Sequence, residues 1–193
     1  MRVNGFVLGL ICSPVILLIY WWLAAQPEPE SPDAESALTL FDINYIPTVP
    51  PKAVSDVPFQ GADKQAVNLK QSLGKPVILH FWAPWCGICL VGMPDMEAFA
   101  KKHGKDVNII CVANDHTGGQ SSKDYYQSND FQHLSLNIDQ HEGQSGSLGG
   151  VFRVRGFPTT VFISAKGEEI GRIIGPVEWQ GAAGELLLKL LKE

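Results

Sequence analysis

A short apolar run over residues 76–82, directly followed by a helical pattern, restricts most strongly how this chain can fold. The run reads PVILHFW, is rich in β-branched and aromatic side chains, and is bounded by turn-forming residues, as is typical of a buried strand. Apolar side chains then recur at helical spacing over residues 86–103, and Gly104 supplies a stop. We expect Pro94 to kink this helix rather than to prevent it. The sequence therefore predicts a central strand that turns directly into a helix.

Strand and helix patterns alternate through the rest of the chain. Such alternation favours a parallel core, and a hairpin near the carboxyl end adds antiparallel strands, so we predict an α/β fold with a mixed central sheet flanked by helices. The expected elements are a hairpin at 57–69, a strand at 107–113, a polar helix at 121–129, a strand at 134–138, a glycine-rich loop at 143–150, strands at 159–164 and 169–174, and an amphipathic helix at 179–192.

The first residues read as a membrane segment. Residues 5–25 are 21 residues without a charge, and a helix of that length is about 30 Å long, the thickness of a bilayer core. Arg2 precedes this stretch, the chain after it has no Lys or Arg until Lys52, and aromatic side chains cluster at residues 20–22. We therefore expect residues 1–25 to form a single N-terminal transmembrane helix whose amino end stays in the cytoplasm.

A cleaved signal peptide is the alternative for the same segment. Cleavage after Ala25 would place Leu23 at a position that takes a small residue, and cleavage after Ala24 would place Trp22 there, so retention is favoured.

A linker and a folded domain follow the membrane segment. Residues 26–37 hold three prolines and four acidic residues without apolar periodicity, so they are predicted to be an acidic, Pro-rich tether. The folded domain is then expected over residues 38–193. A formal net charge of −5 and the lack of a basic cluster exclude a nucleic-acid surface.

Two cysteines, Cys86 and Cys89, lie at the junction between the predicted strand and helix. Unpaired N–H groups and the macrodipole at a helix amino terminus favour a thiolate, so Cys86 is predicted to be the nucleophile. Cys89, one helical turn further on, would then attack Cys86 to resolve a mixed disulfide. Half of a zinc site and a purely structural disulfide are the alternatives, but the other cysteines lie in apolar segments and the domain has core enough without a cross-link.

The residues around the cysteines resemble the active-site segment of thioredoxins. The match covers FWAPWCGIC at residues 81–89, and RGFPTT at residues 155–160 resembles the loop in which thioredoxins hold a cis proline beside the cysteine pair. The resemblance spans roughly residues 57–193 and implies a thioredoxin-like three-layer fold. It also implies a cis Pro158 with a catalytic role and a substrate surface formed by Trp85, Gly87, Ile88 and Phe157, where the backbone of Phe157 pairs with an extended substrate.

Within this superfamily the chain is most similar to the membrane-anchored TlpA and ResA branch. The predicted tether, the segment between residues 115 and 139, and Met93-Pro94 carry that similarity. It implies a thiol:disulfide oxidoreductase in the bacterial inner membrane, single-pass, with its C-terminal domain in the periplasm. It implies no cofactor other than the redox-active Cys86–Cys89 disulfide, and no metal. The implied partners are periplasmic protein thiols and disulfides, and an upstream membrane electron donor of the DsbD or CcdA type.

Two positions depart from that branch. Its members commonly have a glutamate three residues after the second cysteine, where this chain has Gly92. The cytochrome c maturation reductant CcmG tends to have a glutamate after the cis proline, where this chain has Thr159. Acid assistance from the first position is therefore not carried over, and a cytochrome c biogenesis role is weakened.

The buried acid of thioredoxins matches His80 in this chain, counted back from Trp82. A histidine there would accept or return the proton of Cys89, or else it is a core histidine bonded to backbone. Cys111 is expected on the adjacent strand, where inert packing is the usual role of a cysteine in apolar surroundings.

Three functions remain open from the sequence: reduction of protein disulfides, oxidation that installs them, and Cu(I) handling by the two soft thiolates. Reduction is favoured, because the Gly87-Ile88 dipeptide lacks the histidine that strongly oxidising relatives place between the cysteines.

Overall fold

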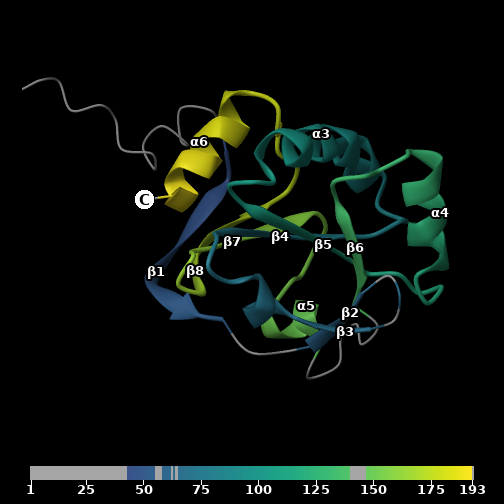
Figure 1. Ribbon diagram of the computed structural model, residues 1–193, viewed down its shortest axis with the longest axis horizontal. Coiled ribbons are helices and arrows are strands. Elements are labelled where there is room, and N and C mark those ends of the chain that lie inside the picture. Colours follow the sequence, from purple (N-terminus) through teal and green to yellow (C-terminus); the bar gives the residue numbers. More distant parts are fainter. Residues whose placement is uncertain (1–42, 55–57, 62, 64, 140–146, 193) are drawn as a thin grey trace, which may run out of the picture. The chain divides into compact units, whose positions relative to one another are not determined.

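An eight-stranded mixed sheet forms the centre of the described part of the chain, in the order β1-β8-β7-β4-β5-β6-β2-β3 (Figure 1). The computed structural model describes residues 43–54, 58–61, 63, 65–139 and 147–192. Strands β4, β5 and β6 run parallel, and the other pairings are antiparallel. The strands are β1 (Tyr45–Ala53), β2 (Pro58–Gly61), β3 (Ala66–Asn68), β4 (Val77–Trp82), β5 (Asn108–Ala113), β6 (Ser135–Ile138), β7 (Thr159–Ile163) and β8 (Glu168–Ile174).

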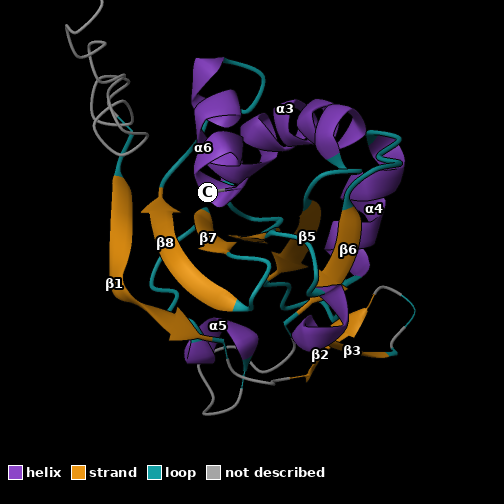
Figure 2. Cartoon of the chain, turned by 60° about the vertical axis from the view of Figure 1, so that its left-hand side comes forward, coloured by secondary structure: helices purple, strands orange, loops and turns teal. Residues whose placement is uncertain are grey.

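Helices cover both faces of this sheet. Figures 1 and 2 show α3 and α6 on one side of the sheet and α5 on the other. The helices are α3 (Gly87–His103), α4 (Gln120–Ser128), α5 (Leu148–Val151), α6 (Ala182–Lys192) and the 3-10 helix η1 (Leu69–Ser72). The predicted α/β architecture with a mixed sheet between helices is therefore confirmed.

Alternate residues of β4 divide the core between the two faces. Ile78 and Trp82 pack in a large cluster with α3, α4 and α6, whereas Val77, Leu79 and Phe81 pack with Leu69 of η1 and Leu148 of α5. Period-two alternation sends successive side chains to opposite faces, so a strand that is apolar throughout is buried on both. The two faces explain why all six residues of β4 are buried.

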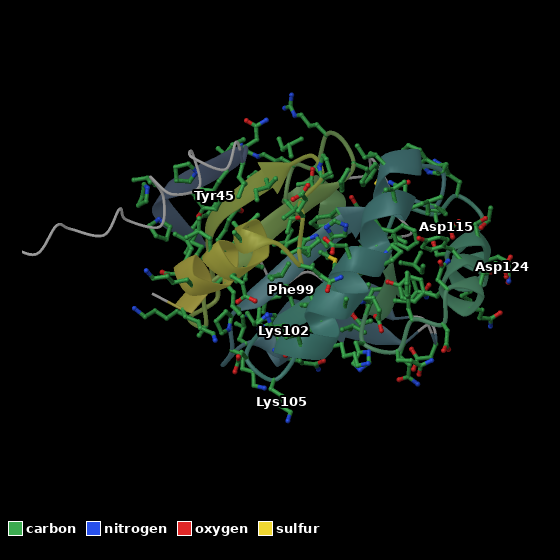
Figure 3. All side chains as sticks on the ribbon, turned by 90° about the horizontal axis from the view of Figure 1, so that it is seen from above. Tyr45, Phe99, Lys102, Lys105, Asp115 and Asp124 are labelled. Carbon is green, nitrogen blue, oxygen red and sulfur yellow. A yellow bond between two sulfur atoms is a disulfide. The ribbon has the colours of Figure 1, made fainter. Side chains whose placement is uncertain are left out.

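The predicted strand-to-helix junction is present. β4 ends at Trp82, Cys86 is the N-cap of α3, and Gly104 is its C-cap. Seen from above, α3 and α6 lie over the sheet, with Phe99 and Lys102 labelled on α3 (Figure 3). The proline at position 94 is inside this helix, as expected.

Three elements differ from the sequence prediction. β1 was not predicted, because it holds three prolines and its apolar residues do not alternate. It is an edge strand that pairs only with β8, and proline is tolerated in such strands. The predicted loop 143–150 ends in the short helix α5, whose N-cap Ser147 accepts from Gly150 N at 3.0 Å. α6 begins at Ala182 rather than 179, because the N–H of Trp179 donates to Asp95 in a turn before the helix.

The predicted membrane anchor at 1–25 and tether at 26–37 lie outside the described residues. Among the helices that are described, none is both long enough and apolar enough to cross a membrane.

Candidate active site

The cysteine pair lies at the amino end of α3 as a disulfide between Cys86 and Cys89. The side chain of Cys86 accepts a hydrogen bond from the backbone N–H of Cys89, at 3.3 Å from nitrogen to sulfur. In the reduced protein the same N–H is placed to stabilise negative charge on Cys86, as N–H groups of a first helical turn generally do.

The two cysteine residues differ in exposure. Cys86 is 9% exposed and Cys89 is 2% exposed, so an incoming disulfide reaches Cys86 first. This asymmetry is in the direction that the predicted roles of nucleophile for Cys86 and resolving residue for Cys89 require.

Residues 155–160, the second segment that resembles thioredoxins, lie beside the loop that carries the cysteines. The peptide bond between Phe157 and Pro158 is cis, which confirms that part of the resemblance. β7 starts at Thr159, which pairs with Phe81 near the end of β4, so Pro158 lies beside the loop that carries the cysteines. The ring of Phe157 contacts Trp85 edge-on, with centroids 5.5 Å apart.

The remaining predicted substrate residues face outward. Ile88 is 52% exposed, and a Cβ placed on Gly87 would meet no atom within 4 Å. A Cβ on Gly92 also meets none, so the place where the related branch carries glutamate is open. Ile88 and Gly92 line a groove of about 800 Å³ between α3 and the end of β8. Most of the residues that line this groove are apolar, and one of them, Ile88, lies between the two cysteines in the sequence.

His80 lies in β4 on the face that α3 covers, two residues before Trp82. Its Nδ1 is 2.9 Å from the hydroxyl oxygen of Thr160 on β7, so its partner is a side chain rather than the backbone of the simpler interpretation. Burial lowers the pKa of His80 from 6.5 to about 4. The ring is therefore neutral at physiological pH.

Cys111 pairs with His80 across β4 and β5, as the sequence suggested. Its sulfur contacts the sulfur of Met96 at 3.7 Å, and burial raises its pKa to about 12. A thiol with these properties is inert at neutral pH, which agrees with a packing role.

A pocket of about 480 Å³ opens on the other side of the disulfide. Cys86 and Trp85 line it together with Asn114 and Asp139, the residues that directly follow β5 and β6. Sequence analysis missed both of these polar residues. The signal was present, because each follows a buried parallel strand, and ligands bind at the carboxyl ends of such strands.

Within residues 43–54, 58–61, 63, 65–139 and 147–192, no group of three or more His, Cys, Asp or Glu side chains is arranged to hold an ion.

Comparison with known proteins agrees with this site. The model of the family described as Redoxin matches residues 45–186. The crystal structure of the pneumococcal exposed lipoprotein thioredoxin Etrx1 from Streptococcus pneumoniae strain TIGR4 is 31% identical, with a TM-score of 0.60. That match covers 71% of this chain and 100% of the other.

Two curated relatives each match about half of the chain. The thiol-disulfide oxidoreductase ResA of Oceanobacillus iheyensis is 31% identical over 107 residues, 55% of this chain and 53% of that protein. Tryparedoxin of Trypanosoma brucei brucei is 33% identical over 111 residues, 56% of this chain and 72% of that protein. The chain thus spans about half the length of the ResA relative.

Proposed function

The chain belongs to the Redoxin family as a thiol:disulfide oxidoreductase of the thioredoxin superfamily, similar to ResA, and we propose that it reduces disulfides of proteins outside the cytoplasm. The observation that carries this proposal is the position of Cys86, which caps α3 and accepts the N–H of Cys89.

The first step is attack by Cys86 on a substrate disulfide. The Cys86 thiolate bonds to one substrate sulfur, the substrate S–S bond breaks, and the other substrate sulfur leaves as a thiolate. The N–H of Cys89 favours the thiolate form of Cys86. A substrate would approach this residue from the side of Gly87, where an added Cβ would meet no atom within 4 Å.

The second step is resolution by Cys89. After losing its proton, the Cys89 thiolate attacks the sulfur of Cys86, and the second substrate thiolate leaves. The substrate has then gained two electrons, and the enzyme holds the Cys86–Cys89 disulfide found in the structure. A membrane electron donor of the DsbD or CcdA type would return the enzyme to the dithiol form.

The reducing direction is supported by the dipeptide between the cysteines. Gly87 and Ile88 offer no cationic or donor side chain to stabilise the thiolate, so the reduced form lacks the extra stabilisation that makes an oxidase.

A trapping experiment tests the reaction. We expect Cys89→Ala in the full-length protein to accumulate mixed disulfides through Cys86 with extracytoplasmic proteins, whereas Cys86→Ala forms none and abolishes turnover of a protein disulfide. Adducts that persist in Cys86→Ala would show that another thiol is the nucleophile.

Outward orientation is proposed from the charge-free residues 5–25 and the acidic segment after them. The Etrx1 neighbour is itself described as an exposed lipoprotein. We expect the full-length chain to sediment with membranes and a phosphatase fused after Glu193 to be active. A reporter that is active only in the cytoplasm would contradict this orientation.

A further inference from the structure

The end of the sheet opposite the disulfide carries an excess of lysine side chains. β4 begins at Val77 and ends at Trp82, so Lys75 lies just before one end of this strand and Cys86 just beyond the other. A strand of this length, at about 3.3 Å for each residue, separates its two ends by roughly 20 Å. The turns that meet around Lys75 are therefore remote from the sulfur chemistry.

Hydrogen bonds bring three of these turns together. The Nζ of Lys75 donates to the carbonyl of Lys105, in the turn that follows α3, at 2.7 Å. The N–H of Gly74 donates to the carbonyl of Ala165, in the turn between β7 and β8, at 3.4 Å. Lys166 is the next residue of that turn, and all three lysines are exposed. Three separate segments of the chain thus place a lysine on one surface.

Two further exposed lysines lie beside this surface. Lys52 is two residues before Val54, whose N–H donates to the carbonyl of Gly167 in the turn between β7 and β8 at 2.9 Å. Lys101 belongs to the last turn of α3, and Lys105 follows the end of this helix (Figure 3). We name the basic end by its five residues, Lys52, Lys75, Lys101, Lys105 and Lys166.

Carboxylates nearby do not neutralise the basic end. Asp106 forms an ion pair with Lys192 at 3.2 Å, and Glu185 forms one with Lys102 at 2.5 Å, so both acids are occupied by lysines outside the five. Within the described residues, none of the five lysines forms an ion pair. Glu168 is the remaining exposed or half-buried carboxylate of these turns. The basic end is therefore positive, although the formal net charge of the whole chain is −5.

Apolar contact adds nothing at this end. The large apolar side chains that are exposed within the described residues lie on β1, around the cysteines and at the end of β8. A partner of the basic end would therefore be held by charge, and the attraction would weaken as salt is added.

We propose that the basic end binds the anionic phospholipid surface of the membrane in which the chain is anchored. The inference rests on the proposed function, because the anchor at residues 5–25 and the outward orientation belong to it. Lysine clusters that lie close to an anchored segment are attracted to anionic headgroups, and anchoring raises their effective concentration at the bilayer.

The length of the linker permits this orientation. Residues 26–42 join the charge-free segment to the described domain, and a chain of that length extends up to about 55 Å. This reach exceeds the distance between the two ends of the sheet, so the basic end can reach the bilayer although β1 begins at the opposite end. The disulfide would then face away from the membrane, toward soluble substrate proteins.

Acylation of lysines in lipid nanodiscs tests this docking. Full-length protein is incorporated into nanodiscs of phosphatidylcholine alone, or of phosphatidylcholine mixed with the anionic phosphatidylglycerol. An N-hydroxysuccinimide ester of acetate acylates the exposed amines, and mass spectrometry along a time course gives the rate at each lysine. The ratio of the rates on the two kinds of disc measures contact with the anionic surface.

We expect Lys105 to be acylated about 3- to 10-fold more slowly on anionic discs at low salt, because one lysine near such a surface gains roughly fivefold in its binding equilibrium. Lys123, on α4, should be acylated at the same rate on both kinds of disc. High salt should remove the difference at Lys105.

A pair of double variants separates the basic end from charge in general. Lys75→Gln combined with Lys166→Gln removes two charges of the basic end and should reduce the effect at Lys105 to less than about 2-fold. Lys123→Gln combined with Arg153→Gln removes two charges elsewhere and should leave the effect unchanged.

Equal acylation of Lys105 on the two kinds of disc, or an effect that persists in the variant of Lys75 and Lys166, would overturn the proposal. Protection on both kinds of disc that disappears when the acidic residues between 28 and 35 are neutralised would also overturn it, because the chain's own acidic segment would then cover the basic end. The proposed function fails separately. Protein that does not enter the discs contradicts the proposed anchor, whereas incorporated protein with equal acylation contradicts the docking alone.

Discussion

Burial determines the protonation of His80. Its pKa is lowered from 6.5 to about 4, and the cause is desolvation of the ring inside the sheet. As pH falls below 6.5, the unfolded chain takes up a proton at this site, whereas the folded protein binds it only near pH 4. The unfolded state thus binds more protons in this window, and the free energy of unfolding decreases as pH falls.

The expected loss is about 2 to 3 kcal/mol by pH 4.5, since each pKa unit corresponds to about 1.4 kcal/mol. Urea unfolding of the oxidised protein and of His80→Leu at pH 7 and pH 4.5 measures it. The decrease in the free energy of unfolding caused by His80→Leu should be smaller at pH 4.5 than at pH 7. Parallel pH dependence in the two proteins would contradict the buried neutral ring.

The same histidine is predicted to accept the proton of Cys89 during resolution. If Nδ1–H donates to Thr160, the other ring nitrogen has a free lone pair. A base with a pKa of about 4 is weak at neutral pH, so we expect His80→Leu to slow resolution by about 10-fold, less than the ~10²-fold typical of a well-matched base. Stopped-flow kinetics on a trapped mixed disulfide separate resolution from the attack by Cys86. An unchanged resolution rate between pH 6 and 8 would make His80 a packing residue.

Three thiols of the described domain should differ sharply after reduction. Cys86 is exposed enough to react and accepts a helix N–H, Cys89 is more buried, and Cys111 has a pKa of about 12. We expect iodoacetamide to modify Cys86 first and to leave Cys111 unmodified until urea unfolds the protein. Mass spectrometry along a time course at several pH values gives the order. Faster modification of Cys89 would reverse the assigned roles.

At the scale of elements, a hydrogen bond from α4 replaces one that Pro94 removes from α3. Pro94 has no N–H, so the carbonyl four residues earlier, on Leu90, loses its helical hydrogen bond. The hydroxyl of Tyr125 on α4 donates to this carbonyl at 2.7 Å. Leu90 follows Cys89 directly, so this bond holds the first turn of the helix that carries the cysteines.

A double-mutant cycle tests that bond. Tyr125→Phe should destabilise the fold by about 1 kcal/mol, the usual value of one hydrogen bond. In a Pro94→Ala background a backbone N–H is restored for Leu90, so the same change should cost less, with a coupling of about 0.5 kcal/mol or more. Urea unfolding of the four proteins measures the coupling. Equal costs in both backgrounds would show that Tyr125 does not replace the missing helical donor.

Two acidic residues connect α3 to neighbouring segments. Asp95 accepts the N–H of Trp179 before α6, and Glu97 accepts backbone N–H groups of residues 132–134 before β6. Burial alone would raise the pKa of Glu97, but the hydrogen bonds from Gln132, His133 and Leu134 hold this pKa below its usual value.

A third acidic residue, Asp115, lies beside α4 (Figure 3), and its carboxylate accepts from the backbone N–H of Ser122 at 2.8 Å. These contacts fix α3 and α4 around the site.

For the whole molecule, the sequence was sufficient to predict those helices and strands whose apolar periodicity and flanking turn residues are strong. The runs that became β4, α3 and β5 were predicted to within one residue at each end. It was insufficient where tertiary pairing decides, as in the proline-rich β1, which pairs with β8 and whose Tyr45 packs on Phe162 with ring centroids 5.8 Å apart.

The candidate site divides in the same way. Cys86, Cys89 and Pro158 follow from local patterns and resemblance. The partner of His80 is 80 positions away in sequence, and the pocket residues Asn114 and Asp139 meet only through the pairing of β5 and β6. These residues are brought together by long-range contacts, and a local sequence pattern holds no information about such contacts.

The direction of electron transfer is the central claim about the molecule, and the reduction potential of the Cys86–Cys89 pair tests it most directly. The full-length protein is equilibrated in glutathione buffers of known potential, and the fraction of disulfide is read by mass spectrometry. A reductase should have a potential near that of thioredoxin, about −270 mV, and an oxidase near that of DsbA, about −120 mV, a difference of roughly 7 kcal/mol. We predict a value closer to thioredoxin, and a value near DsbA would contradict the proposed reduction of protein disulfides.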